Sequence, residues 1–216
     1  MQFSAELREA AAPVWEAQLE HPFVRGIGDG SLPEDRFRFY VRQDYLFLID
    51  YGRLLALAAA RAPRLEWMRR FASLAESVLE TEMDLHRQFA ARWGITAEQL
   101  ESERTAPATD AYCDFLLRTA SLGDFAELAA AVLPCMWSYA EIGTHLAASG
   151  LPEHDGYSEW IEMYASDEFG ELAAWCRELT DAAAAEVAGP ARRRMHAAFR
   201  ASSEHELAFW DSAWQG

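Results

Sequence analysis

Four segments of the chain carry helix-like apolar stripes, and each stripe is interrupted once by a side chain that can do chemistry. The interrupting residues are Asp44, Glu82, Cys135 and Glu206. Steps of three and four residues keep all members of a stripe on one helix face, which normally packs inward. The stripes are Phe37-Tyr40-Asp44-Phe47-Tyr51-Leu54, Phe71-Leu74-Val78-Glu82-Leu85-Phe89, Leu128-Val132-Cys135-Tyr139-Ile142-Leu146 and Met195-Phe199-Ser202-Glu206-Phe209-Ala213.

Burying an unpaired carboxylate costs several kcal/mol or shifts its pKa instead. Three carboxylates and one thiol on inward faces therefore predict a shared polar pocket inside a helical bundle. The alternative is structural, because each acid could pair with an Arg or cap a neighbouring helix.

The composition predicts one all-α domain spanning residues 1–216. The 216 residues suffice for one sizeable core, hydrophobic residues make up 51%, and Ala is abundant. We expect helices at about 3–20 (bent at Pro13), 32–61, 63–92, 96–103, 107–122, 125–148, 157–165, 168–187 and 191–213. The glycine-rich segment 21–30 is expected to break the helical pattern. Ser31 with Glu34, Thr96 with Gln99 and Asp124 with Glu127 have the spacing of helix caps.

The charge and cysteine content exclude several classes of protein. A net charge of −16 repels phosphate backbones, so nucleic-acid binding is not expected. All 19 basic residues are Arg, which excludes Schiff-base chemistry on a lysine. Three cysteines without a CxxC pair argue against a disulfide framework or a structural zinc site. No secretory signal or membrane-spanning stretch is visible, so a cytoplasmic protein is expected.

Cys135 follows Pro134 inside a helical pattern, a position that is compatible with a reactive thiol but that by itself favours an ordinary core residue. Proline removes one backbone hydrogen bond and kinks the helix, which opens space beside the next side chain. A Cys in that space can act as a nucleophile if its thiolate is stabilised. The alternative is an ordinary small core residue. Cys113 and Cys176 lack such a context and are interpreted as packing residues.

Asp44 and Glu206 face the expected pocket and can hold an amino-heterocycle or transfer protons. Glu82 is interpreted as a supporting group or as a partner for an Arg. Aromatic residues on or near these segments suit a flat heteroaromatic ligand, although aromatic stripes usually indicate a protein core. They are Phe47, Tyr51, Tyr112, Trp137, Tyr139 and Tyr164.

A metal site is not expected. A ferritin-like di-iron site needs two Glu-x-x-His pairs, and none of the six histidines has a Glu three positions before it. Glu82 with His86 and Glu141 with His145 have the four-residue spacing of ordinary helix pairs.

Several blocks, in order along nearly the whole chain, resemble the TenA/thiaminase II family, in its cysteine-containing branch. They are His21-Pro22-Phe23-Val24, Gly26-Ile27-Gly28-Asp29-Gly30, Tyr40-Val41-Arg42-Gln43-Asp44-Tyr45, Glu82-Met83 with Leu85-His86, Leu133-Pro134-Cys135-Met136-Trp137-Ser138-Tyr139 with Glu141-Ile142-Gly143, Tyr157 to Trp160 to Tyr164, and Ser202-Ser203 to Glu206 to Phe209-Trp210.

This resemblance implies a heme-oxygenase-like helical bundle, usually a homotetramer, with no cofactor. It implies hydrolysis of 4-amino-5-aminomethyl-2-methylpyrimidine to the hydroxymethyl compound in thiamin salvage, with slower cleavage of thiamin. Cys135 would attack the pyrimidine ring, Asp44 would hold its amino side, and Glu206 would shuttle protons. Phe47 would stack on the ring, while Tyr112, Tyr139 and Tyr164 would shape the pocket.

The chain departs from the family pattern at two places. Glu204-His205 stands where aromatic residues often precede the last glutamate, and Met136 stands where an aromatic residue is common. Two other functions stay open: a di-iron oxidase of the same fold, and a pyrimidine-binding protein without turnover. Metal analysis and ammonia release would distinguish them from a hydrolase.

Overall fold

The computed structural model describes residues 2–216, and within that range all regular secondary structure is helical, as expected. The elements are α1 (Phe3–Ala10), α2 (Ala12–Leu19), α3 (Pro22–Asp29), α4 (Glu34–Arg61), α5 (Leu65–Ser77), the π-helix η1 (Val78–Glu82), α6 (Met83–Arg92), α7 (Ala97–Glu101), α8 (Pro107–Leu122), α9 (Phe125–Ala147), α10 (Asp155–Tyr164), α11 (Asp167–Ala185) and α12 (Gly189–Gln215).

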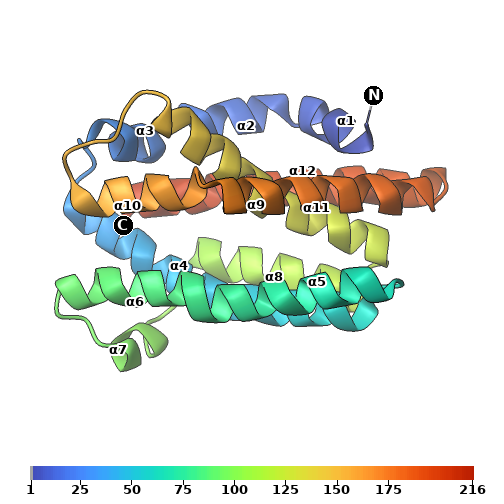
Figure 1. Ribbon diagram of the computed structural model, residues 1–216, viewed down its shortest axis with the longest axis horizontal. Coiled ribbons are helices and arrows are strands. Elements are labelled where there is room, and N and C mark those ends of the chain that lie inside the picture. The colour runs from blue at the N-terminus through green and yellow to red at the C-terminus, as the bar shows by residue number, and fades with distance from the viewer. Residues whose placement is uncertain (1) are drawn as a thin grey trace.

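The helices form a layered bundle around α9 and α12 (Figure 1). On one side, α1, α2 and α3 cover α12, and α11 packs along α9. On the other side, α4 packs against α5, α6 and α8. The α5–η1–α6 rod and the α10–α11 rod run side by side across the face seen in Figure 1, and both matter for the site below.

The first expected helix breaks at Ala11, not at Pro13. Pro13 lies in the first turn of α2, where the missing N–H of proline costs the helix no hydrogen bond. The segment 21–30, expected to be irregular, contains α3. Its cap is unusual, because the ring Nδ1 of His21 accepts from the backbone N–H of Phe23 at 3.2 Å. Gly30, with φ 77°, ends this helix in the left-handed conformation.

Two of the three expected helix caps form. Thr96 and Gln99 make a reciprocal capping box at α7, and Asp124 accepts from the Glu127 N–H at α9. The third prediction was wrong, because Ser31 does not cap α4. The Ser31 N–H is bound by Asp29, and the Glu34 carboxylate instead accepts from the Trp93 indole at 2.7 Å.

The expected helix 63–92 is interrupted by the π-helix at Val78–Glu82. A π turn adds a residue to the helical repeat, so it rotates the following face relative to a continuous α-helix. Such turns are frequent at functional sites. This one ends at Glu82, one of the four residues that interrupt the apolar stripes.

Buried apolar side chains form two clusters. The larger contains Phe47, Tyr51, Tyr112 and Met136, and the smaller contains Tyr40, Tyr139 and Tyr164 among others. Asp44 lies on α4 between Tyr40 of one cluster and Phe47 of the other. The polar residues predicted from the stripes therefore lie where the two clusters meet.

Gly143 on α9 fixes how α10 packs beside the site. A Cβ at Gly143 would lie 2.6 Å from the Tyr164 carbonyl carbon and 2.8 Å from the Ala165 nitrogen. Because backbone cannot yield easily, we expect Gly143→Ala to destabilise the fold by about 1–3 kcal/mol, the usual cost of overpacking. Gly170→Ala is the control, since its Cβ meets nothing within 4 Å, and it should be neutral or stabilising. Urea unfolding of both variants tests this, and equal stability would contradict it.

Candidate functional site

An inner pocket lies at the seam between the two clusters, with a cavity volume of about 20 Å³. Seven of the predicted site residues line it, from α4, η1, α9 and α10: Asp44, Phe47, Tyr51, Glu82, Cys135, Tyr139 and Tyr164. Leu48, Met136 and Phe169 complete the wall. The volume is about that of one water molecule. A pyrimidine therefore requires some of these side chains to move.

Cys135 presents the accessible part of its side chain to this pocket. It follows Pro134 within α9, as the sequence predicts. Burial raises the pKa of the Cys135 thiol well above its usual value, and the charges of Glu206, Glu82 and Asp44 raise it further. Tyr51 acts in the opposite direction. The resting side chain is therefore a thiol, and it needs a base before it can act as a nucleophile.

The Glu206 carboxyl group lies within hydrogen-bonding reach of that thiol, and it is almost completely buried. Burial, aided by the charge of Asp44, raises the pKa of Glu206 to about 8, while hydrogen bonds from Tyr112 and Cys135 oppose the shift. The sequence analysis placed its carboxylate facing the pocket. In the structure neither Glu206 nor Tyr112 lines the pocket wall, and Glu206 lies behind Cys135.

Hydrogen bonds tie the Glu206 carboxyl group to α8 and α9. The Tyr112 hydroxyl donates to Glu206 Oε1 at 2.6 Å and lies 3.0 Å from Ser202 Oγ, and Ser202 donates to the Ala131 carbonyl at 2.7 Å. The bond from Tyr112 favours the ionised carboxylate, whereas burial favours the protonated form and outweighs it.

Asp44 is held by a partner that the sequence analysis missed, the fully buried His86. His86 Nε2 lies 2.7 Å from Asp44 Oδ2, and the Tyr40 hydroxyl donates to the same oxygen at 3.2 Å. His86 Nδ1 lies 2.9 Å from the backbone carbonyl of Glu82. Because a carbonyl can only accept, Nδ1 carries a hydrogen, and an ionised Asp44 makes His86 an imidazolium.

Burial alone would lower the pKa of His86, but hydrogen bonding and charge from Asp44 outweigh it, so that the pKa is raised overall. Among residues 2–216, the hydrogen bonds to Asp44 involve only Oδ2. The other carboxylate oxygen is left for a ligand. The sequence signal for His86 was its place one turn after Glu82, which was interpreted only as side-chain pairing with Glu82.

Glu82 accepts a hydrogen bond from the Tyr164 hydroxyl at 2.9 Å, and it pairs with no Arg among the described residues. Burial and the charge of Asp44 raise its pKa to about 7, against the opposing influence of His86 and Tyr164. Tyr164 packs on Tyr139 at 4.8 Å and on Trp160 at 4.7 Å between ring centroids. These aromatic contacts fix the wall on which Glu82 is held.

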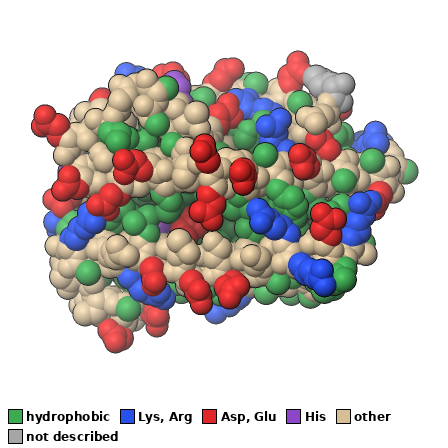
Figure 2. All heavy atoms as spheres, viewed as in Figure 1, with side chains coloured by type: hydrophobic (Ala, Val, Ile, Leu, Met, Phe, Trp, Pro, Cys, Tyr) green, Lys and Arg blue, Asp and Glu red, His purple; other side chains and the backbone are tan. Residues whose placement is uncertain are grey.

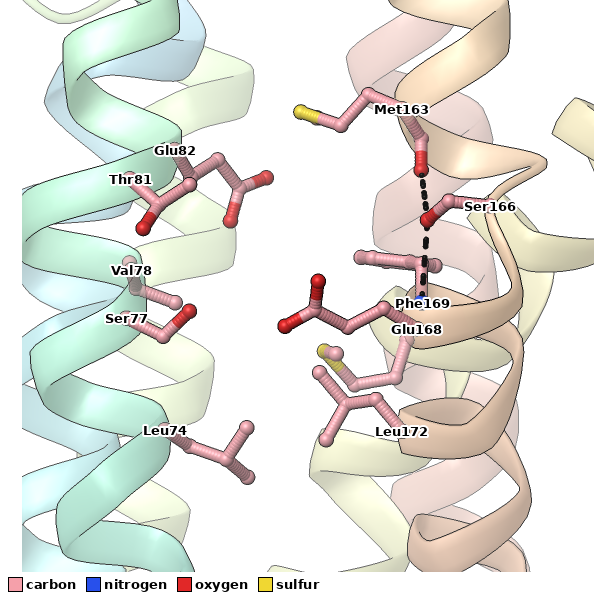
Figure 3. A pocket seen from close by; sticks show the side chains of 11 residues that line it. Leu74, Ser77, Val78, Thr81, Glu82, Met163, Ser166, Glu168, Phe169 and Leu172 are labelled. Carbon is pink, nitrogen blue, oxygen red and sulfur yellow. Dashed lines mark hydrogen bonds between the residues drawn. The ribbon is translucent and has the colours of Figure 1, made fainter.

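A second space, the outer chamber, adjoins the inner pocket and shares Glu82, Met136 and Phe169 with it. Its cavity volume is about 120 Å³. Glu82 on one wall and Glu168 on the other extend toward the space between the two rods (Figure 3). The chamber opens on the groove between these rods, where Figure 2 shows hydrophobic side chains at the surface.

Both departures from the family pattern lie beside these residues. His205 stacks on Tyr112 with ring centroids 5.3 Å apart and planes at 10°, so it takes the place of an aromatic side chain there. Met136 lines both the inner pocket and the outer chamber.

Residues 2–216 contain neither a cluster of metal ligands nor a helix that could span a membrane. No group of three or more His, Cys, Asp or Glu side chains is arranged to hold a metal ion. None of the helices has the length and apolar character needed to cross a membrane.

Nearly the whole length of the chain matches known proteins in both sequence and structure. A protein from Halalkalibacterium halodurans described as aminopyrimidine aminohydrolase is 46% identical over 215 residues, covering 99% of this chain and 96% of that protein. A Bacillus subtilis protein of the same description is 39% identical, covering 100% of this chain and 91% of that protein.

The fold is also found in solved structures. A TenA homologue from P. horikoshii OT3 superimposes with a TM-score of 0.91 at 30% identity, covering 100% of this chain and 99% of that one. A Shewanella denitrificans domain with a heme oxygenase-like fold, at 15% identity, superimposes with a TM-score of 0.76 over 98% of this chain and 91% of that one. This likeness confirms the expected fold class.

The family description TENA/THI-4/PQQC matches residues 8–216, a range that includes every residue of the inner pocket and of the Glu206 and His86 networks. With relatives 46% and 39% identical over nearly the whole chain, the chain belongs to the TENA/THI-4/PQQC family.

Proposed function

We propose that this protein is an aminopyrimidine aminohydrolase of the thiaminase II type, in the cysteine-containing branch of its family. It would hydrolyse 4-amino-5-aminomethyl-2-methylpyrimidine to the hydroxymethyl compound in thiamin salvage, and cleave thiamin more slowly. The description shared by the two bacterial relatives supports this activity. The observation that carries it is the meeting of Cys135, Asp44 and the buried base Glu206 around one aromatic pocket.

The proposed reaction begins with proton transfer from the Cys135 thiol to ionised Glu206, while the sulfur adds to the ring carbon next to the substituted one. The ring electron pair displaced by sulfur moves through the ring and expels the 5-substituent, leaving an exocyclic methylene. An ammonium leaves as neutral ammonia. Water then adds to the methylene, the carbon–sulfur bond breaks, sulfur recovers its proton from Glu206, and the proton lost by the water goes to ammonia.

In this scheme Asp44 binds the 4-amino group, which becomes electron-poor as the substituent leaves. A fixed carboxylate that accepts from that group is stabilising where positive charge develops. Its free oxygen faces the pocket side because His86 and Tyr40 hold the other one. His86 is thus a positioning residue, acting on the substrate only through Asp44.

The ring itself would lie against Phe47, with Tyr51, Tyr139 and Tyr164 around it. Tyr112 would act through Glu206, since it is hydrogen-bonded to that carboxyl group and does not line the pocket.

We also propose that residues 1–216 form one domain that assembles as a cytoplasmic homotetramer, needs no cofactor and does not bind nucleic acid. The net charge of −16 is consistent with the last point. Exposed apolar side chains such as Leu65 and Leu122, at 60% and 77% exposure, are available for contacts between subunits.

Replacing Cys135 tests the nucleophile. Cys135→Ser should abolish turnover of both pyrimidine and thiamin, while the change in volume is too small to shift the melting temperature by more than a few degrees. Cys113→Ser is the matched control, because Cys113 is buried on α8 outside the pocket, and its turnover should stay near that of the wild type. Ammonia release and product analysis measure the effect. A Cys135→Ser enzyme with a near-normal rate would refute the mechanism.

The Asp44–His86 pair predicts a non-additive effect on stability. His86→Leu leaves a buried carboxylate without its charged partner, so we expect a loss of about 3–5 kcal/mol. The double variant Asp44→Asn/His86→Leu removes the stranded charge and should be clearly more stable than His86→Leu alone. Urea unfolding of the single and double variants checks this. In kinetics, His86→Gln should retain more pyrimidine affinity than His86→Leu, because only Gln can still donate to Asp44. Additive stability losses would argue against the pair.

The raised pKa of Glu206 predicts how the rate depends on pH. Only ionised Glu206 accepts the thiol proton, so kcat/KM should rise as pH increases through a value near 8. Thiamin suits this measurement because its thiazolium charge is permanent. Glu206→Gln should lower turnover by about 10²–10⁴-fold and remove this rise. Identical pH profiles for the wild type and the variant would show that another group is the base.

A further inference from the structure

The outer chamber differs from the inner pocket in being larger, mostly apolar and acidic. Its walls come from α5 and η1 on one side and from α10 and α11 on the other, with Met136 of α9 at the back. Leu74, Val78, Met163, Phe169 and Leu172 supply apolar surface. The only charged side chains among its lining residues are Glu82 and Glu168.

We propose that the outer chamber is the binding site for the group that leaves from the pyrimidine, and that Glu168 selects for a bulky aromatic cation, an azolium, at that position. This inference rests on the proposed function, because it needs the pyrimidine ring in the inner pocket. The two spaces share Glu82, Met136 and Phe169, so a substituent on the ring has a continuous path from one to the other.

Glu168 is available for such a ligand. It is exposed on the first turn of α11, and its carboxylate extends toward the opposite wall, which carries Glu82 (Figure 3). Within the part of the chain that the structure describes, it makes no salt bridge and no side-chain hydrogen bond, whereas Glu82 is already bound by Tyr164. The backbone of this turn is fixed, because Ser166 Oγ accepts from the Phe169 N–H and donates to the Met163 carbonyl.

The size and chemistry of the chamber favour an azolium over a simple ammonium ion. An ammonium on the ring's methylene is compact and well hydrated, and Glu82 at the junction is the nearest chamber carboxylate to the inner pocket. A ring-shaped cation extends further from the pyrimidine into the outer chamber than an ammonium does. It can bury its apolar surface against the leucines and Phe169, contact the thioethers of Met136 and Met163, and still meet Glu168.

The charge of the leaving group changes during the reaction, so the acidic walls also affect how strongly the leaving product is bound. A thiazolium departs as a neutral thiazole once it takes the bonding electron pair. The attraction to Glu168 and Glu82 is then lost. The chamber therefore binds the substrate more strongly than the leaving product, and this favours release through the groove.

The experiment compares two substrates and three variants, of which two neutralise a charge and one reverses it. Glu168→Gln should lower kcat/KM for thiamin by about three- to fivefold, the scale of one partly exposed ion pair, and change that for the aminomethylpyrimidine little. Glu168→Arg should lower the thiamin value further, because it replaces attraction with repulsion. Glu171→Gln, the same change on the same helix but outside the chamber, is the matched control and should affect neither substrate.

Thiamin binding measured by calorimetry separates this proposal from the proposed function. If the wild type turned over neither substrate, the proposed function would fail. Weaker thiamin binding by Glu168→Gln than by Glu171→Gln would still support the outer chamber as a binding site for the leaving group. Equal losses for both substrates, or unchanged thiamin binding and turnover in Glu168→Gln and Glu168→Arg, would overturn the selective role of Glu168.

Discussion

The constraint on which the site depends is the enclosure of three carboxyl groups and a thiol between two apolar clusters. Four adjacent negative charges cannot be buried together, because each raises the pKa of the others and water is excluded. The protein resolves this in two ways. Asp44 is given a buried imidazolium, His86, as its counter-charge. Burial raises the pKa values of Glu206, Glu82 and Cys135 instead, which favours their neutral forms, least so for Glu82 with a pKa of about 7.

This distribution of protons assigns different chemistry to similar side chains. Asp44, held on one oxygen by His86 and Tyr40, is a fixed acceptor that suits recognition. Glu206 lies at the head of a hydroxyl chain ending at the Ala131 carbonyl of α9, so it can gain or lose a proton without exposing a charge to solvent. The helix that carries Cys135, α9, also anchors that chain through the Ala131 carbonyl. The proposed nucleophile and the proposed base are therefore both held by this helix.

The sequence predicted that four ionisable groups lie on inward helix faces, because an ionisable residue on an apolar stripe can be recognised from its spacing alone. The sequence could not show how deeply each group is buried or which group it is hydrogen-bonded to. Glu206 and Glu82 look alike on their stripes, yet one lies behind Cys135 and the other at the boundary of two cavities. His86 was missed because its partner is 42 residues away on another helix. The helix α3 was missed because Gly26, Gly28 and Gly30 are typical of a break, whereas only Gly30 ends the helix.

A substrate that carries a positive charge completes this arrangement. In the free protein Glu206 is mostly protonated at neutral pH, because its pKa is about 8 and Asp44 contributes to that value. A cation bound in the outer chamber beside Glu82 and Glu168 favours the ionised forms of the carboxyl groups near it, since an opposite charge nearby lowers the pKa of a carboxyl group. When Asp44 accepts a hydrogen bond from the amino group of the ring, its charge also raises the pKa of Glu206 less. Under the proposed mechanism, substrate binding would therefore favour the ionised form of Glu206 that accepts the proton of Cys135.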